Sequence, residues 1–262
     1  MIAALEASRL SKAFGGLSAV DDVSFIVPQG SLTAVIGPNG AGKTTVFNLV
    51  TNLYQADKGE VRLFGERLGN ERAWQIAARG VVRTFQTARV FPGMTAFENV
   101  LAGAHMHLRS GPAWQMLWLG RVRREEARLA IKAERLLELV GLARFRDAPA
   151  TDLPIGGQKL LEVLRALMAR PRLLLLDEPA AGLNDAETAE LAALLRTVRG
   201  TGVTVMVVEH NMSLVMGVAD QVIVLDAGRL VTAGTPRAIQ QDKRVIEAYV
   251  GQEEGFPDHA GG

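Results

Sequence analysis

Residues 37–45 read GPNGAGKTT, and this stretch decides the fold of the chain. It matches the pattern GxxxxGK[ST], in which a glycine-rich loop surrounds phosphates with backbone N–H groups. The apolar run Thr33–Ile36 precedes the loop, and an apolar-periodic helical pattern, Lys43–Leu53, follows it. A strand, a tight loop and a helix start in this order form an anion site, because the helix N-terminus carries partial positive charge. A glycine-rich turn without a ligand is the alternative, and these flanking elements disfavour it.

Each residue type in this stretch suits phosphate chemistry. Glycines let the backbone turn its N–H groups inward. Lys43 is expected to reach the β- and γ-phosphates, and the Thr44 hydroxyl is expected to ligate Mg²⁺. The candidate phosphate-binding residues are Gly37, Pro38, Asn39, Gly40, Ala41, Gly42, Lys43, Thr44 and Thr45.

A second acidic site is expected where another buried strand ends. Residues 173–178 read LLLLDE, so Asp177 closes an apolar run and Glu178 follows it. A phosphate-binding loop needs a carboxylate on a neighbouring strand to hold the magnesium ion. Asp177 fits that role, and Glu178 fits a general base that polarises the attacking water. Helix capping is the alternative for an acidic pair at a strand end.

Composition limits the class of protein. The chain has 262 residues with 29 Lys+Arg, 28 Asp+Glu and no Cys, so disulfide scaffolds, thiolate zinc sites and cysteine nucleophiles are excluded. The net charge of +1 gives no electrostatic reason to expect a nucleic-acid partner. No secretory signal is visible in the first residues, and charged residues or proline interrupt the two most apolar stretches, 201–225 and 101–119. We therefore expect no membrane span in this chain, so membrane partners would have to supply the spans.

Apolar runs alternate with helical patterns along much of the chain. Runs such as LLLL and VTVMVV are apolar on both faces, which is typical of central strands in a parallel sheet. The helical pattern Asp185–Arg199 lies between these two runs. This order predicts an α/β fold. The expected strands are Val23–Val27, Leu32–Ile36, Glu60–Phe64, Val81–Phe85, Leu173–Leu176, Val203–Val208 and Val222–Leu225.

The middle of the chain is expected to be a helical insert. Almost no strand pattern appears between Pro92 and Arg170, whereas 124–140 is strongly amphipathic. Thr95 and Glu98 have the spacing of a capping box, which predicts a helix start there. We expect one nucleotide-binding core from residues 1–91 and 171–251, a helical subdomain at 92–170, and a flexible tail at 252–262.

With these motifs in this order, the chain resembles the ATP-binding cassette (ABC) ATPases over nearly its whole length. The resemblance implies an α/β P-loop NTPase core with a mainly parallel sheet, an antiparallel β portion and an inserted α-helical subdomain. It also implies that Phe14 stacks on adenine, that Gln86 senses Mg²⁺ and the γ-phosphate, and that His210 contacts the γ-phosphate. The segment EPAAGLN, ending at Asn184, is similar to the one that crosses the dimer interface in this family.

Several stretches are similar to the longer, G-type ATPases of branched-chain amino acid importers. These are FGGLSAVDDVSF, RTFQTARVFPGMTAFENV, VEHNM and GTPRAIQQDKRVIEAYVG, together with an insertion-like region at 104–124. The resemblance implies ATP and Mg²⁺ as cofactors and a peripheral position on the cytoplasmic face of the inner (plasma) membrane. The implied partners are a second, distinct ATPase, two membrane permeases and, indirectly, a soluble binding protein.

The family's signature segment departs from its usual form here. The family has LSGGQ or LSYGQ at a helix start, whereas residues 153–158 read LPIGGQ. Either alignment register leaves Pro154 or Ile155 at the serine position, so one hydrogen bond to a phosphate, worth about 1.5–3 kcal/mol, is absent. The N–H groups of Gly156 and Gly157 remain available to a partner's nucleotide. Two interpretations stay open: a harmless variant, or a weak ATP site opposite this signature.

The expected mechanism is a motor in which two ATPases enclose two ATP molecules. Loss of the γ-phosphate contacts would open the dimer, and the permeases would dock in a groove beside the helical insert. Its candidate apolar residues, for which packing inside the insert is the alternative, are Val90, Phe91, Met94 and Phe97. Other cargoes remain alternatives (urea, amides, aromatic acids or lipopolysaccharide export), as do a soluble ABC ATPase acting on nucleic acid or ribosomes and a non-hydrolysing subunit.

Overall fold

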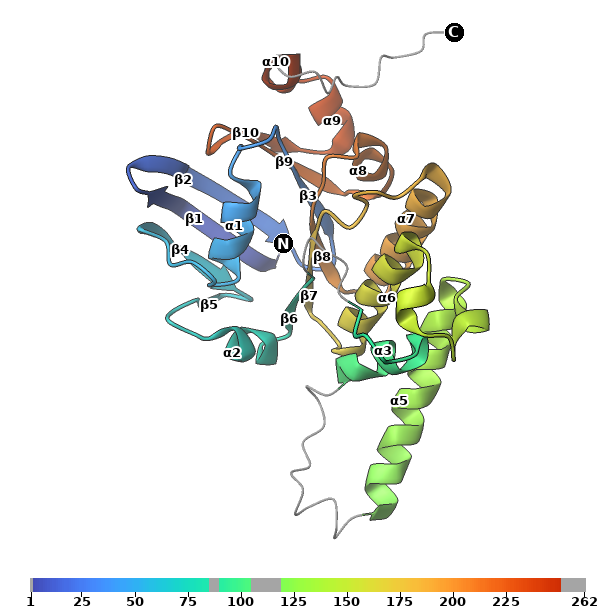
Figure 1. The fold of residues 1–262 in the computed structure, drawn as a ribbon. Helices are drawn as coiled ribbons and strands as arrows, with labels where there is room; N and C mark the ends of the chain where they lie inside the picture. The colour runs from blue at the N-terminus through green and yellow to red at the C-terminus, as the bar shows by residue number, and fades with distance from the viewer. Residues whose placement is uncertain (1, 85–89, 105–118, 251–262) are drawn as a thin grey trace, which may run out of the picture.

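The computed structural model describes residues 2–84, 90–104 and 119–250 (Figure 1). These residues form one six-stranded and one four-stranded sheet together with the helices that cover them. The predicted α/β class, with a mainly parallel sheet and an antiparallel portion, is confirmed. No helix of the described residues combines the length and the apolar character that crossing a membrane requires.

The six-stranded sheet carries the phosphate-binding loop. Its strands lie in the order β10-β9-β3-β8-β7-β6, and every neighbouring pair is parallel except β10 with β9. Every residue of β3, β7 and β8 is buried, which explains why these strands read as unbroken apolar runs. The strands are β3 (Leu32–Ile36), β6 (Val81–Arg83), β7 (Leu173–Asp177), β8 (Thr204–Val208), β9 (Gln221–Asp226) and β10 (Arg229–Gly234).

The four-stranded sheet is antiparallel and lies in the order β2-β1-β4-β5. Its strands are β1 (Ala3–Phe14), β2 (Leu17–Pro28), β4 (Lys58–Leu63) and β5 (Glu66–Arg67). The sequence predicted only Val23–Val27 and Glu60–Phe64 of this sheet, and β1 was missed. Its pairing with both neighbours is irregular between Ala7 and Ser11, which interrupts the alternation of apolar and polar residues that marks a strand.

Two apolar cores lie on opposite faces of the six-stranded sheet. Leu174 and Leu176 of β7 face the core shared with the helices of the insert and the C-terminal half, whereas Leu173 and Leu175 face the core shared with the antiparallel sheet and α1. Figure 1 shows the two layers, with α1 and the antiparallel sheet on one side and α6, α7 and α8 on the other. The sheet is therefore a central layer that fixes the loops at its edge.

The described part of the insert is helical. Between residues 92 and 170 the structure has α3 (Ala96–Ala102), α5 (Leu119–Leu139), α6 (Ile155–Met168) and the short 3-10 helices η2 (Ala143–Phe145) and η3 (Ala150–Asp152). The described residues of this range contain no strand, only an isolated bridge between Thr95 and Pro149. Most of the insertion-like region 104–124 and the tail at 252–262 lie outside the described residues.

The remaining helices each follow a strand, except α10, which follows α9. They are α1 (Lys43–Val50), α2 (Ala73–Ala78), α7 (Asp185–Gly200), α8 (Met212–Val218), α9 (Pro236–Gln240) and α10 (Lys243–Val250). The sequence predicted that α1 would extend to Leu53, but it ends at Val50. The chain turns there because Asn52 adopts a left-handed conformation with φ 57°, and the Leu53 N–H donates back to the Asn48 carbonyl at 2.8 Å.

Candidate nucleotide site

The glycines of the loop between β3 and α1 are required by close backbone approaches. A Cβ at Gly37 would lie 2.1 Å from the Leu225 carbonyl oxygen, and one at Gly42 would lie 2.5 Å from that of Ala19. Both glycines also have positive φ, at 151° and 92°, a region that L side chains avoid. The loop is therefore packed between β9 and β2, which fixes the start of α1.

A cavity of about 580 Å³ opens at this loop. It brings the loop together with Glu178, which follows β7 more than 130 residues later in the chain. The lining residues are Leu17, Ser18, Ala19, Asn39, Gly40, Ala41, Gly42, Lys43, Thr44, Thr45, Glu178 and Ala227. Seven of the nine candidate phosphate-binding residues and the candidate base therefore share one cavity, whereas Gly37 and Pro38 are buried and do not line it.

Lys43 turns its ammonium group into the loop. The side chain is 7% exposed, and its Nζ donates to the carbonyl oxygens of Gly37 at 2.6 Å and of Pro38 at 2.9 Å. Helix α1 starts behind Gly42, which provides no side-chain cap. The first turn thus offers backbone N–H groups and a cation beside the exposed Thr44, which is the chemistry that a polyphosphate requires.

Asp177 ends β7 in a buried position, and its two carboxylate oxygens differ. Oδ2 accepts from Nη2 of Arg83 at 2.8 Å, whereas Oδ1 is buried and has no hydrogen-bond partner among the described residues. Burial raises the pKa of Asp177, and the hydrogen bond and charge of Arg83 oppose that shift. A buried oxygen without a partner fits the requirement of a magnesium ligand, directly or through water.

Arg83 is a site residue that the sequence did not reveal. It ends β6, and besides Asp177 it donates to Asn48 Oδ1 at 2.6 Å and to Thr51 Oγ1 at 3.2 Å, both at the end of α1. The arginine therefore ties the helix of the phosphate-binding loop to the acidic strand end. Its only sequence signal was its place near the end of an apolar strand pattern.

Glu178 has an unusual backbone conformation. Its φ is 48°, which is uncommon for a residue with a side chain, and its N–H donates to the Val208 carbonyl at 2.9 Å. Strands β7 and β8 pair Asp177 with Val208, so the segments after both strands start at the same edge. His210 follows β8 at this edge and is exposed, but it does not line the cavity.

Phe14 lies beside an aromatic partner. It ends β1, is 42% exposed, and meets Tyr54 edge to face with 5.2 Å between ring centroids. Phe14 pairs with Leu17, which lines the cavity. An exposed aromatic pair at this border offers a surface on which a base can stack. The sequence did not point to Tyr54.

The other predicted site residues lie elsewhere. Gln86, predicted to sense Mg²⁺ and the γ-phosphate, is outside the described residues. Gly156 and Gly157 are in the first turn of α6 behind Pro154, which has no side-chain cap bond, and they do not line the cavity. They therefore offer their N–H groups at a different place from the phosphate-binding loop.

The four candidate docking residues divide into two pairs. Phe91 and Met94 are 45% and 40% exposed, whereas Val90 and Phe97 are partly buried against the core of the insert. The Arg165 guanidinium lies 4.6 Å from the Phe91 ring centroid. Phe91 and Met94 are thus the accessible members of this surface.

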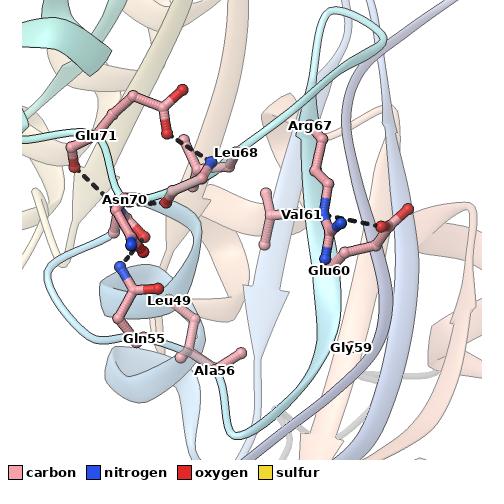
Figure 2. Close-up of a pocket in the computed structure, with 12 residues that line it drawn as sticks. Leu49, Gln55, Ala56, Gly59, Glu60, Val61, Arg67, Leu68, Asn70 and Glu71 are labelled. Atoms are coloured by element: carbon pink, nitrogen blue, oxygen red, sulfur yellow. Dashed lines mark hydrogen bonds and ion pairs between the residues drawn. The ribbon is translucent and has the colours of Figure 1, made fainter.

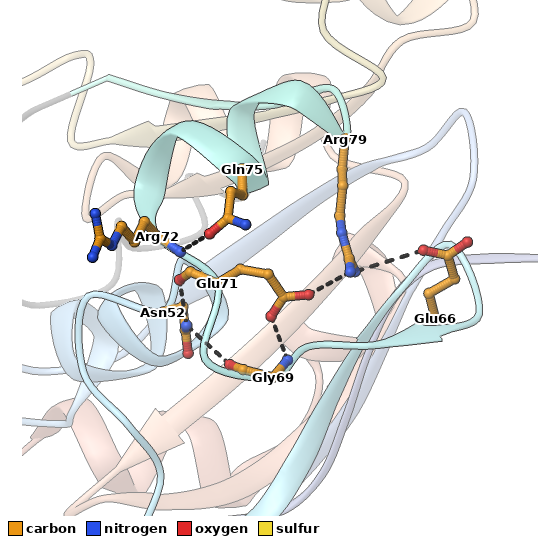
Figure 3. A network of polar contacts seen from close by, with 7 residues as sticks. All are labelled: Asn52, Glu66, Gly69, Glu71, Arg72, Gln75 and Arg79. Carbon is orange, nitrogen blue, oxygen red and sulfur yellow. Dashed lines mark hydrogen bonds and ion pairs between the residues drawn. The ribbon is translucent and has the colours of Figure 1, made fainter.

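A second cavity, of about 390 Å³, lies at the C-terminal end of α1 (Figure 2). Its charged walls are already paired: Arg67 Nε contacts Glu60 at 3.1 Å, and Glu71 bonds to Arg79 and to the Gly69 N–H. Figure 3 shows the contacts of Glu71, beside which Asn52 donates to the Gly69 and Glu71 carbonyls at 3.0 and 2.7 Å. These groups satisfy one another, and their contacts connect the segment after α1 with β5 and the segment before α2.

Comparison with known proteins identifies the family of the chain. The family model described as "ABC transporter" matches residues 20–181. The chain is 44% identical over 249 residues to the high-affinity branched-chain amino acid transport ATP-binding protein BraF of Pseudomonas aeruginosa, covering 95% of this chain and 98% of that protein. It is 40% identical to the corresponding protein LivG of Salmonella typhimurium, with the same coverage.

Solved structures show the same fold. A nucleotide-free ATP-binding cassette from an ABC transporter superposes with a TM-score of 0.80 at 30% identity, covering 96% of this chain and 100% of that one. An ATP-binding cassette described in its ADP conformation superposes with a TM-score of 0.81 at 29% identity and the same coverage.

Proposed function

The chain belongs to the ABC transporter family, and on that premise we propose that it is the ATP-hydrolysing subunit of an importer for branched-chain amino acids. The observation that carries the proposal is the cavity in which Lys43 and Thr44 of the loop meet Glu178 from β7. The cargo is inferred from the names of the relatives that share 40–44% of its residues over nearly the whole chain.

The residues of the site divide the work of ATP binding. The N–H groups of residues 39–44, the first turn of α1 and the Lys43 ammonium hold the phosphates. Thr44 and Asp177 would hold Mg²⁺, together with Gln86 as the resemblance implies. When bound, the ion neutralises charge on the β- and γ-phosphates. The Phe14–Tyr54 pair supports the adenine by stacking.

Glu178 acts as the base that orients and deprotonates the attacking water. His210, at the same edge of the sheet, contacts the γ-phosphate when the dimer is closed. Gly156 and Gly157 at the start of α6 bind the nucleotide held by a second ATP-binding subunit. Loss of the γ-phosphate contacts after hydrolysis favours the open dimer, because the contacts that favoured closure are gone.

The working complex is proposed to be a heterodimer with a second ATPase, bound to two permeases and served by a soluble binding protein. It would lie at the cytoplasmic face of the membrane without binding nucleic acid.

We propose that residues 1–91 and 171–251 of the chain form the nucleotide-binding core and that residues 92–170 form the signature subdomain. The permeases would contact the exposed Phe91 and Met94. Copurification of permeases and a sister ATPase supports this role, whereas copurification of ribosomes or nucleic acid contradicts it.

The decisive variant is Glu178→Gln in the assembled transporter. The amide keeps the size of the side chain but cannot accept the proton, so we expect ATP binding to persist and turnover to fall by about 10²–10⁴-fold. In a mixture of this variant with the second ATPase and without permeases, ATP should then trap the closed dimer, which size-exclusion chromatography detects. Lys43→Ala is the matched control, because it should lose ATP binding itself. Substantial hydrolysis by Glu178→Gln would put the base elsewhere.

The cargo is tested separately from the hydrolysis. Permeases, both ATPases and the binding protein are reconstituted in liposomes, and ATP turnover is measured with leucine, urea or an aromatic acid present. Leucine or another branched-chain amino acid should stimulate turnover most. Stimulation by a different cargo alone would leave the ATPase role intact and overturn the branched-chain assignment.

A further inference from the structure

Two buried side chains of opposite charge hold the short segment 178–181, which begins with the proposed base. Lys159, on α6, is 8% exposed, and Glu209, directly after β8, is 0% exposed. Neither lines the cavity at the phosphate-binding loop. A buried charge is tolerated only with partners that replace its water, and both side chains find such partners on the backbone of this segment.

Lys159 holds the segment from the side of α6. Its Nζ donates to the carbonyl oxygen of Glu178 at 3.4 Å and to that of Ala181. The lysine lies in the second turn of α6, only two residues after Gly157. The end of the helix that faces a partner's nucleotide is thus directly connected to the base of the chain's own site. Figure 1 shows α6 beside α7 on the face of the sheet that carries the signature subdomain.

Glu209, directly after the neighbouring strand β8, holds the same segment from the other side. Its Oε1 accepts from the Ala180 N–H at 2.7 Å, and its Oε2 accepts from the N–H groups of His210 at 3.2 Å and Asn211 at 3.3 Å. The Glu209 N–H in turn donates to Val35 on β3 at 3.2 Å. One carboxylate therefore joins the base segment to the loop that carries His210 and anchors both to the sheet.

The two charges support each other. Burial lowers the pKa of Lys159, and the charges of Glu209, Glu162 and Glu178 oppose that shift. Burial likewise raises the pKa of Glu209, and the hydrogen bonds from the Ala180 and Asn211 N–H groups oppose that shift. Glu178 itself has φ 48°, and such a conformation persists only when surrounding contacts impose it. Lys159 bonds to the carbonyls on either side of Ala180, and Glu209 bonds to the N–H of Ala180, so the segment is fixed from both sides.

We propose that Lys159 and Glu209 are positioning residues that set the backbone of residues 178–181 and thereby aim Glu178 and His210 at the nucleotide. Through Lys159, a shift of the signature end of α6 on one nucleotide changes the geometry of the base at the other. The catalytic consequence rests on the proposed ATPase function, whereas the structural consequence does not.

The structural arm of the test is hydrogen exchange on the full-length chain without nucleotide. Lys159→Met keeps the length of the side chain but removes its donors and charge, and Glu209→Gln keeps size but removes charge. In both, we expect the amide of Ala180 to exchange faster, and by more than the amides of the core strands, which report any general loss of stability. Unchanged exchange at Ala180 in both variants overturns the proposal, whether or not the protein hydrolyses ATP.

The catalytic arm measures ATP turnover in the assembled transporter. We expect either substitution to lower kcat by about tenfold to a hundredfold with little change in KM, since a misplacement of about 1 Å can cost about 10²-fold. The double variant should lose little more than the worse single one, because both residues act on one segment. If the kcat losses of the single variants add in the double variant, or if the loss of kcat only matches the loss of folded protein, the two residues have a merely structural role.

Lys132 supplies the matched control. It is another partly buried lysine of the insert, on α5, and its Nζ donates to the Leu167 carbonyl at 3.0 Å, away from residues 178–181. Lys132→Met should leave kcat and Ala180 exchange unchanged, and Lys159→Arg should restore both. If Lys159→Met fails to fold, Lys159→Gln replaces it with the same expectations. Loss of kcat in Lys132→Met equal to that in Lys159→Met would contradict a specific role.

Discussion

Arg83 shows how one side chain can hold two motifs together. Removing it leaves the Asp177 carboxylate, which is 3% exposed, without its cation. We predict that Arg83→Met lowers the free energy of unfolding by about 3 kcal/mol, because an uncompensated buried charge is costly. Urea unfolding followed by circular dichroism measures the loss.

The cost should depend on the charge of Asp177 and not on lost packing. In an Asp177→Asn background, the same Arg83→Met substitution should therefore cost much less. Asn48→Ala is a useful comparison, since it removes one acceptor of Arg83 but keeps the ion pair. An equal loss in the wild-type and Asp177→Asn backgrounds would show that the charge is not the cause.

The residues that sequence reasoning found and those it missed differ in how they are encoded. The residues of the loop 37–45 are contiguous, and their spacing reports their chemistry directly. Arg83 and Asp177 lie 94 residues apart, and Lys159 reaches Ala181 across another gap. No local sequence pattern predicts such pairs, because they form only when separate elements pack together. Apart from Tyr54, the sequence thus predicted the groups proposed to touch the nucleotide but not those that position them.

The start of α3 is an element whose local signals proved sufficient. The Thr95 hydroxyl accepts from the Glu98 N–H at 3.2 Å, and the Glu98 carboxylate accepts from the Thr95 N–H at 2.8 Å. This confirms the predicted capping box. We predict that Thr95→Ala lowers the free energy of unfolding by about 1 kcal/mol, measured by chemical denaturation, and that Thr95→Ser loses much less. Equal losses for both substitutions would mean that the hydroxyl is not what stabilises the helix start.

Strands β1 and β10 escaped prediction for different physical reasons. β1 is central in its sheet, yet Arg9 adopts φ 49° beside Gly59, where the pairing with β2 and β4 shifts. β10 is an edge strand in which no residue is fully buried, so it has no apolar run. The buried strands β3, β7, β8 and β9 were predicted, because a strand that is buried on both faces has a continuous run of apolar residues.

At the scale of the whole molecule, the apolar content of the chain is accounted for by two cores. The six-stranded sheet contributes alternate residues of the same strands to both, which explains 48% hydrophobic residues in a chain without a span among its described helices. Among the described residues in and beside the insert, the exposed large apolar side chains are Phe91, Met94, Ile131, Leu139 and Ile155. Ile155 is adjacent to Pro154, at the surface proposed to meet a second ATPase.

The start of α6 bears on the two ATP sites of that dimer. Pro154 occupies the N-cap of α6 with φ −52° and ψ 155° and provides no side-chain bond, and serine fits this backbone conformation. If the missing hydroxyl weakens the partner's ATP site, Pro154→Ser should raise ATPase and transport of the assembled transporter, because one bond to a charged group, about 1.5–3 kcal/mol, returns. The same hydroxyl can also cap α6, so thermal unfolding of the isolated chain measures that separate effect. A rise in melting temperature with unchanged turnover would favour the harmless variant, and a rise in turnover would favour two unequal sites.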